Sequence, residues 1–209
     1  MNATPGNTSA TAPDDEADLV ALLGSRICHD LVSPVGAISN GLELLEMAHG
    51  QSEEIALIRG SVEVAMARLR FFRMAFGAGR DEQLIPAREV LSVLHAMYAT
   101  SRTSIYWTDD EDRARPELRL ALLALLCTEV ATPWGARVEV GRDAAAWTIH
   151  VEGERLKIDH ALWEALGSGR MPSDLKGAEV QFGILAREAR QLRRPVSVSA
   201  DDTRLSLVI

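Results

Sequence analysis

Apolar side chains recur every three or four residues along two neighbouring segments of this sequence, and such spacing is typical of long packed helices. The apolar positions of the first segment, residues 17–48, are Ile27, Leu31, Val35, Ile38, Leu42 and Leu45. The second segment begins after Ser52, a favourable helix N-cap residue, and ends at Gly77. Its apolar positions are Ile55, Ile58, Val62, Met66, Leu69, Phe72 and Phe76. The short break at residues 49–52 therefore predicts two long helices folded into an antiparallel hairpin.

A hairpin of only two helices cannot bury all of its apolar stripe. Large side chains such as Leu31, Ile38 and Ile58 would face water in a single chain. A second copy of the chain would bury these side chains, because two hairpins can form a four-helix bundle. We therefore expect a homodimer.

The sequence pattern changes after Gly79, where shorter helical periods alternate with strand-like runs. The helical periods span about residues 87–99, 116–130, 160–166 and 180–192. The strand-like runs are residues 104–107, 137–140, 147–151, 196–199 and 205–209. Alternating polarity in the last two runs predicts an antiparallel pair with one buried face. Strands covered by helices on one face form an α/β sandwich, so we expect an α+β protein.

The sequence divides into three parts. Residues 1–16 are small, polar and acidic, without an apolar period, and we expect them to be a disordered tail. The helical hairpin then occupies residues 17–78, and the α/β domain occupies residues 79–209. The acidic run from Asp109 to Arg115 reads as a solvated loop.

Composition excludes several classes of function. A net charge of −8 argues against a nucleic-acid partner. No apolar run is long enough to cross a membrane, and the first residues lack a secretory signal. Cys28 and Cys127 are too few for a disulfide framework, which fits a reducing compartment. We therefore expect a cytoplasmic protein that contacts neither membranes nor nucleic acid.

A histidine and an aspartate, His29 and Asp30, lie inside the first predicted helix. At about 100° per residue, His29 points away from the apolar seam. It shares a narrow polar stripe with Ser33, Gly36 and Asn40. Such a cleared surface suits a nucleophile that another protein must approach closely, although an isolated surface histidine is more often simply solvated.

Several residues around this stripe destabilise a helix. Gly36 and Gly41 each cost about 1 kcal/mol relative to alanine, and Pro34 costs about 3 kcal/mol in a helix interior. Because the apolar period continues despite these costs, we infer either close approach by a partner or a kink at Pro34.

The sequence HDLVSP, residues 29–34, resembles the phosphoacceptor box of two-component histidine kinases. The longer run CHDLVSPVGAISNGLELLE, residues 28–46, more closely resembles the ChpT-type histidine phosphotransferases. Further matches are RFFRMAFG (70–77) and FGILAREA (182–189), and the resemblance covers nearly everything after residue 17.

This resemblance implies catalytic roles for three residues. His29 would carry a phosphoryl group, and Asp30 would accept a hydrogen bond from the other ring nitrogen. Adjacent helix residues do not face each other, so the sequence leaves their contact open. Ser33 would lie near the transferred phosphoryl group or an attacking water, although it is equally well explained as a solvated helix position.

The resemblance also implies partners. The phosphoryl group would come from the receiver domain of a hybrid histidine kinase of the CckA kind. It would pass to response regulators of the CtrA and CpdR kinds. The phospho-aspartate and Mg²⁺ of those receivers would supply most of the chemistry.

Receiver docking is expected around His29. Gly36, Ala37 and Asn40 leave room for an approaching helix, although Ala37 and Gly41 would serve contacts between helices or subunits equally well. Reflection through the turn near residue 50 places position 29 opposite about residue 72. We therefore expect three residues of the second helix to border the site: Arg68, Phe71 and Met74.

The α/β domain resembles a histidine-kinase ATP-binding domain but departs from its nucleotide motifs. Thr128-Glu129-Val130 stands where a magnesium-binding asparagine is expected, and Glu152-Gly153-Glu154 stands in the region of the adenine-binding motif. Gly167-Ser168-Gly169 is only a weak indication of a lid. We expect no cofactor and no metal in this chain, with Mg²⁺ only in the partner receiver, and a docking role for this domain. The alternatives are a divergent ATP-dependent histidine kinase and a non-enzymatic dimeric adaptor that binds receivers.

Overall fold

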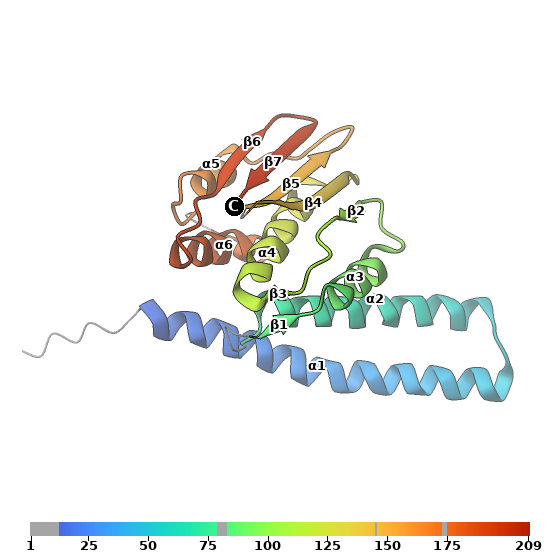
Figure 1. Ribbon diagram of the computed structural model, residues 1–209. Coiled ribbons are helices and arrows are strands. Elements are labelled where there is room, and N and C mark those ends of the chain that lie inside the picture. The colour runs from blue at the N-terminus through green and yellow to red at the C-terminus, as the bar shows by residue number, and fades with distance from the viewer. Residues whose placement is uncertain (1–12, 79–82, 145, 173–174) are drawn as a thin grey trace, which may run out of the picture.

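Two long antiparallel helices lie along one side of a mixed unit of strands and helices (Figure 1). The computed structural model describes residues 13–78, 83–144, 146–172 and 175–209, with only the helical backbone for residues 13–18. The helices are α1 (Pro13–His49) and α2 (Glu53–Phe76). The predicted α+β class is confirmed, while the dimeric bundle stays a prediction because a single chain is present.

The hairpin forms where capping and turn residues permit it. Gly50 adopts a φ of +79°, which favours glycine, and the Ser52 hydroxyl accepts a hydrogen bond from the Ile55 amide at 3.3 Å. Arg59 of α2 donates to both carboxylate oxygens of Glu46 and joins the two helices near this turn. The hairpin is thus fixed at its tip by local interactions.

The helix α1 begins earlier than the sequence suggested. Residues 13–16, which we expected in the disordered tail, are helical, and residues 1–12 lie outside the described residues. A proline followed by three acidic residues is a favourable helix start, because proline needs no amide donor there and negative charge complements the helix dipole.

The five-stranded sheet has the order β2-β4-β5-β7-β6. Its strands are β2 (Ser104–Trp107), β4 (Arg137–Asp143), β5 (Ala146–Glu152), β6 (Ser197–Ala200) and β7 (Arg204–Val208). The pair β2–β4 is parallel and the other pairs are antiparallel. The predicted antiparallel pairing of the last two strands is therefore confirmed. A separate pair of two-residue strands, β1 (Leu84–Ile85) and β3 (Arg113–Ala114), was not predicted.

The helices of this unit cover one face of the sheet (Figure 1). They are α3 (Ala87–Tyr98), α4 (Arg115–Ala131), α5 (His160–Gly167), the 3₁₀ turn η1 (Gly177–Glu179) and α6 (Val180–Gln191). Most of α4 is buried, and the core also contains Trp147, Ile149 and Phe182. Alternate residues of β5 are buried and exposed, so the opposite face of the sheet is open to solvent.

The helix α2 belongs to both parts of the molecule. One face packs on α1, while Ala67, Phe71 and Met74 are buried in the core shared with α3 and α4. Polar contacts reinforce this junction, since Arg119 of α4 donates to the Gly77 carbonyl at 2.5 Å. The hairpin and the α/β unit are therefore packed together along α2.

The segment from residue 109 to 115, expected to be a solvated loop, is exposed at residues 110–112 but buried at both ends. Asp109 and Arg115 are buried, and Arg113 donates to both carboxylate oxygens of Asp109, at 2.9 and 2.5 Å. Asp112 accepts a hydrogen bond from the Ala87 amide at 3.0 Å and so caps α3. The charged side chains of this segment thus bond to each other and to the start of α3, so part of the acidic run belongs to the fold.

Candidate functional site

The His29 side chain projects from the outer face of α1. It is 84% exposed, whereas its neighbour Cys28 is buried against α2, about 100° around the helix. Ser33 and Asn40 on the same stripe are exposed, and Gly36 is half-buried. The imidazole is therefore accessible to a large partner.

The glycines of this helix differ in what they permit. A Cβ atom built at Gly24 would lie 3.2 Å from the Cβ of Phe76, so this glycine allows α1 and α2 to approach closely. Beyond its own stretch of helix, a Cβ at Gly36 or Gly41 would meet no atom within 4 Å. The open space at these two positions faces outward, and it is available to a second molecule.

Asp30 reaches the imidazole despite its adjacent position in the helix. Its Oδ1 lies 3.3 Å from Nδ1 of His29, and its Oδ2 accepts a hydrogen bond from Nε of Arg26 at 2.8 Å. The hydrogen bond with His29, followed by the one from Arg26, holds the pKa of the Asp30 carboxyl below its usual range. An ionised carboxylate can only accept, so in the neutral imidazole this contact favours the tautomer with the proton on Nδ1 and the lone pair on Nε2.

The backbone beside the site is continuous but short of one hydrogen bond. The helix α1 runs across Pro34, which has no amide proton to offer to the Asp30 carbonyl one turn earlier. The helix therefore continues without a break through Pro34 and the glycines, although these residues destabilise a helix, and this stretch lies next to His29.

Two of the three residues expected on α2 do not border this site. Phe71 is fully buried and Met74 is nearly so, which makes their predicted docking role wrong. Arg68 is partly exposed but turns toward α4, where its Nη2 lies 3.4 Å from Oε1 of Glu129. Counting residues from the turn shows which part of α2 lies opposite His29, but it does not show which side of α2 faces outward.

The exposed α2 residues in this region are two arginines that we did not predict. Arg70 and Arg73 alternate with the buried Phe71 and Met74. Burial raises the pKa of the Cys28 thiol, and the positive charge of Arg73 partly opposes this shift, so Arg73 lies near Cys28. The RFFRMAF pattern could have indicated these arginines, because apolar residues three apart share the buried face of a helix.

Two polar side chains of α4, where a magnesium-binding asparagine was expected, make contacts within the chain. The Thr128 hydroxyl donates to the Leu125 carbonyl at 2.7 Å, and Glu129 accepts a hydrogen bond from the Tyr98 hydroxyl at 2.7 Å. A Cβ at Gly183 of α6 would lie 2.8 Å from Cδ1 of Leu175. The segment before α6 is therefore packed onto it.

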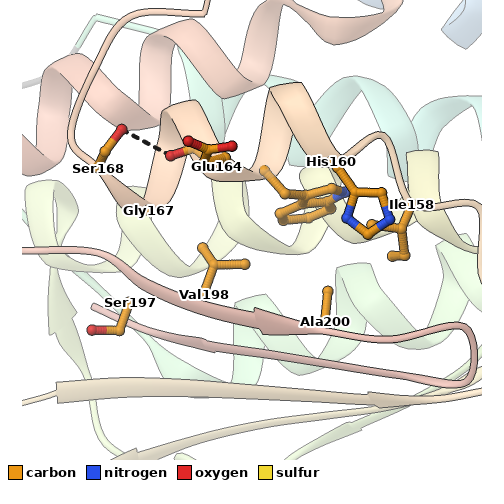
Figure 2. A pocket seen from close by; sticks show the side chains of 9 residues that line it. Ile158, His160, Glu164, Gly167, Ser168, Ser197, Val198 and Ala200 are labelled. Carbon is orange, nitrogen blue, oxygen red and sulfur yellow. Dashed lines mark hydrogen bonds between the residues drawn. The ribbon is translucent and has the colours of Figure 1, made fainter.

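Several hollows lie on this part of the molecule, including one of about 690 Å³ lined in part by Glu152 and Glu154, and two others border α5. One of these two, of about 590 Å³, is lined by residues including Asp159, Arg170 and Lys176. The other, of about 580 Å³, lies between α5 and the edge strand β6, where His160 and Val198 line it (Figure 2). Within the described residues, no group of three or more His, Cys, Asp or Glu side chains is placed to hold a metal ion.

Comparison with known proteins agrees with this geometry. The family model described as the histidine phosphotransferase C-terminal domain matches residues 87–204. The protein phosphotransferase ChpT of Brucella abortus (strain 2308) is 33% identical over 194 residues, which cover 88% of this chain and 92% of that protein. A solved structure of a bacterial phosphotransferase superposes with a TM-score of 0.67 and 27% identity, covering 95% of this chain and 98% of the other. In the part of the chain that the structure describes, no helix has the length and apolarity to cross a bilayer.

Proposed function

Because the chain belongs to the family of ChpT-type histidine phosphotransferases, we propose that His29 is the residue that accepts and returns the phosphoryl group. The protein is a phosphotransferase, and neither the ATP-dependent kinase nor the non-enzymatic adaptor is favoured. The observation that supports His29 is its exposed ring, with Nδ1 engaged by Asp30 and Nε2 left for attack.

The proposed transfer needs no net proton movement. The Nε2 lone pair of the neutral imidazole attacks the phosphorus of an aspartyl phosphate in the donor receiver. The Nε2–P bond forms, the P–O bond to the donor aspartate breaks, and the donor carboxylate leaves with the electron pair. Nδ1 keeps its proton, and the positive charge that develops on the ring faces the Asp30 carboxylate. The same steps in reverse deliver the phosphoryl group to an acceptor aspartate.

Ser33 and the small residues beyond it complete the proposed contact surface. The Ser33 hydroxyl is exposed one turn after His29, where it can approach the transferred group or a water molecule. Gly36, Ala37 and Asn40 continue along the helix, and the empty space outside Gly36 supports close approach of a receiver helix.

We propose that the chain itself uses no cofactor and that Mg²⁺ belongs to the partner receiver. This proposal is supported by the bonds that occupy Thr128 and Glu129 and by the packing of Leu175 against α6. The α/β unit then serves as a structural and docking domain.

As a family member, the chain works with phosphorelay partners such as receiver domains and response regulators. We propose a hybrid kinase receiver of the CckA kind as donor and regulators of the CtrA and CpdR kinds as acceptors. The expected cytoplasmic location stays a prediction.

We further propose that the protein is a homodimer. Along the seam of α1, large apolar side chains remain about half-exposed in the single chain, as does Ile58 on α2. They are Ile27, Leu31, Ile38 and Leu45. A second hairpin laid on this seam would remove them from water.

The test is phosphoryl transfer from a purified receiver domain, phosphorylated on its aspartate with acetyl phosphate, in the absence of ATP. The wild-type chain should acquire an acid-labile phosphohistidine, and His29→Ala should acquire none. His49→Ala, which removes an exposed histidine at the end of the same helix, is the matched control and should behave as wild type. Equal labelling of His29→Ala would overturn the assignment.

A further inference from the structure

Three side chains on the outer side of α1 form a continuous chain of hydrogen bonds. Nε of Arg26 donates to Oδ2 of Asp30 at 2.8 Å, and the other carboxylate oxygen lies 3.3 Å from Nδ1 of His29. Arg26 precedes Asp30 by four residues, so the two lie one above the other on the helix. Arg26 is therefore linked to the imidazole through Asp30.

The Asp30 side chain has little reason of its own to turn toward His29. Residues i and i+1 of a helix point about 100° apart, and a half-exposed carboxylate is equally well solvated when it faces water. Once Arg26 binds Oδ2, the plane of the carboxylate is fixed, and Oδ1 remains directed at the ring. The bond from Arg26 thus selects one orientation of Asp30 among several.

We propose that Arg26 is a positioning residue for phosphoryl transfer, which acts by holding Asp30 so that His29 presents the lone pair of Nε2. This inference rests on the proposed role of His29. Arg26 itself touches no reacting atom in this arrangement.

The charge of Arg26 has a second consequence for the same step. A carboxylate bonded to arginine is a weaker base, so Asp30 accepts the Nδ1 proton in a hydrogen bond without removing it. When the ring is neutral with its proton on Nδ1, it becomes positively charged as the Nε2–P bond forms. Asp30 then stabilises that charge through the bond that Arg26 has already oriented.

The expected size of the effect is modest because Arg26 is 73% exposed. Exposed i, i+4 ion pairs shift a conformational equilibrium by a factor of about two to five at most. Arg26→Met, which keeps much of the aliphatic stem but removes the donor and charge, should slow transfer from a phosphorylated receiver by about that factor. Arg26→Lys keeps a donor and a charge, so it should recover most of the rate.

A purely structural role would not change the protonation of the ring. The second readout is therefore the tautomer of His29, measured by ¹³C and ¹⁵N NMR at a pH where the imidazole is neutral. Arg26→Met should lower the fraction protonated at Nδ1, and Arg26→Lys should restore it. Arg204→Met removes a similarly exposed arginine, paired with Glu152 at 3.6 Å, and should change neither quantity.

A rival role for Arg26 is direct contact with the phosphoryl group or the receiver. Combining Arg26→Met with Asp30→Asn distinguishes positioning from direct contact, because a residue that acts through Asp30 loses its effect when Asp30 is changed. In the Asp30→Asn background, Arg26→Met should cause no further loss of rate. An equal loss in both backgrounds, or an unchanged tautomer in Arg26→Met, would overturn the proposal. Transfer to His29→Ala would instead show that the proposed function itself is wrong.

Discussion

Phe71 offers the sharpest test of how the hairpin is joined to the rest of the molecule. The sequence placed it on the docking surface, whereas the structure buries it completely between α2, α3 and α4. Replacing a buried phenylalanine by alanine costs about 3–5 kcal/mol, because apolar surface is lost and a cavity remains. In a chain of this size, about 1 kcal/mol lowers the melting temperature by roughly 2–4 °C. Phe71→Ala should therefore melt roughly 6–20 °C below wild type.

The assay is thermal and urea unfolding at one fixed protein concentration, because association with a second copy also contributes to stability. Leu57→Ala is the control, since Leu57 is largely exposed on the same helix and its loss should change stability by no more than about 0.5 kcal/mol. Phe71→Leu keeps most of the volume and should remain folded, with transfer from a phosphorylated receiver close to wild type. Normal stability of Phe71→Ala together with lost transfer would refute the core assignment and restore the docking role.

Three further results are expected. NMR titration of Asp30 should show a carboxyl pKa below the usual range, and His29→Ala should raise it, because the hydrogen bond with His29 is its largest cause. Since that pKa is lowered in the folded chain, the contact is present above the ordinary carboxyl range and is lost as pH falls through the lowered value. Cys28 and Cys127 are buried with raised thiol pKa values, so both should resist thiol reagents until guanidinium unfolds the chain, and rapid modification of the native protein would contradict their placement. Ile38→Asp should convert a dimer to single chains by light scattering, because it places a charge on the exposed apolar seam, and an unchanged mass would argue against that seam.

The regular elements of this protein could be predicted because their signals are local. Apolar spacing marked both hairpin helices and all five strands of the main sheet, and Ser52 capped α2 as expected. The two-residue strands β1 and β3 carry no such period, since they exist only through pairing with each other. The burial of Asp109 and Arg115 was missed because the fold, and not a local pattern, supplies the partners of this segment, such as the Ala87 amide that bonds to Asp112.

Candidate site residues could be proposed from the sequence along α1, and their roles stay predictions, whereas the positions proposed across the hairpin on α2 were not reliable. His29, Asp30 and Ser33 follow each other within a short local motif, so the sequence alone indicated them. Arg26 could also have been found, because an arginine four residues before an aspartate is a common helix ion pair. The predictions for Phe71 and Met74 were wrong because α2 has a second buried face, toward α3 and α4, which the apolar period assigned to this helix did not include.

The helix α2 connects the proposed phosphotransfer site to the α/β unit through a partly buried carboxylate contact. Glu129 lies on α4 in the region expected for a nucleotide ligand, yet its carboxylate accepts from Tyr98 of α3 and pairs with Arg68 of α2. Burial and the nearby charge of Glu129 raise the pKa of Tyr98 far above its ordinary value, so the tyrosine remains a donor at any physiological pH. The engagement of this carboxylate by two helices supports the proposal that it does not serve as a Mg²⁺ ligand. The same group joins α2 to α3 and α4, and α2 packs on the helix that carries His29, which supports the proposal that the α/β unit holds the hairpin in place during transfer.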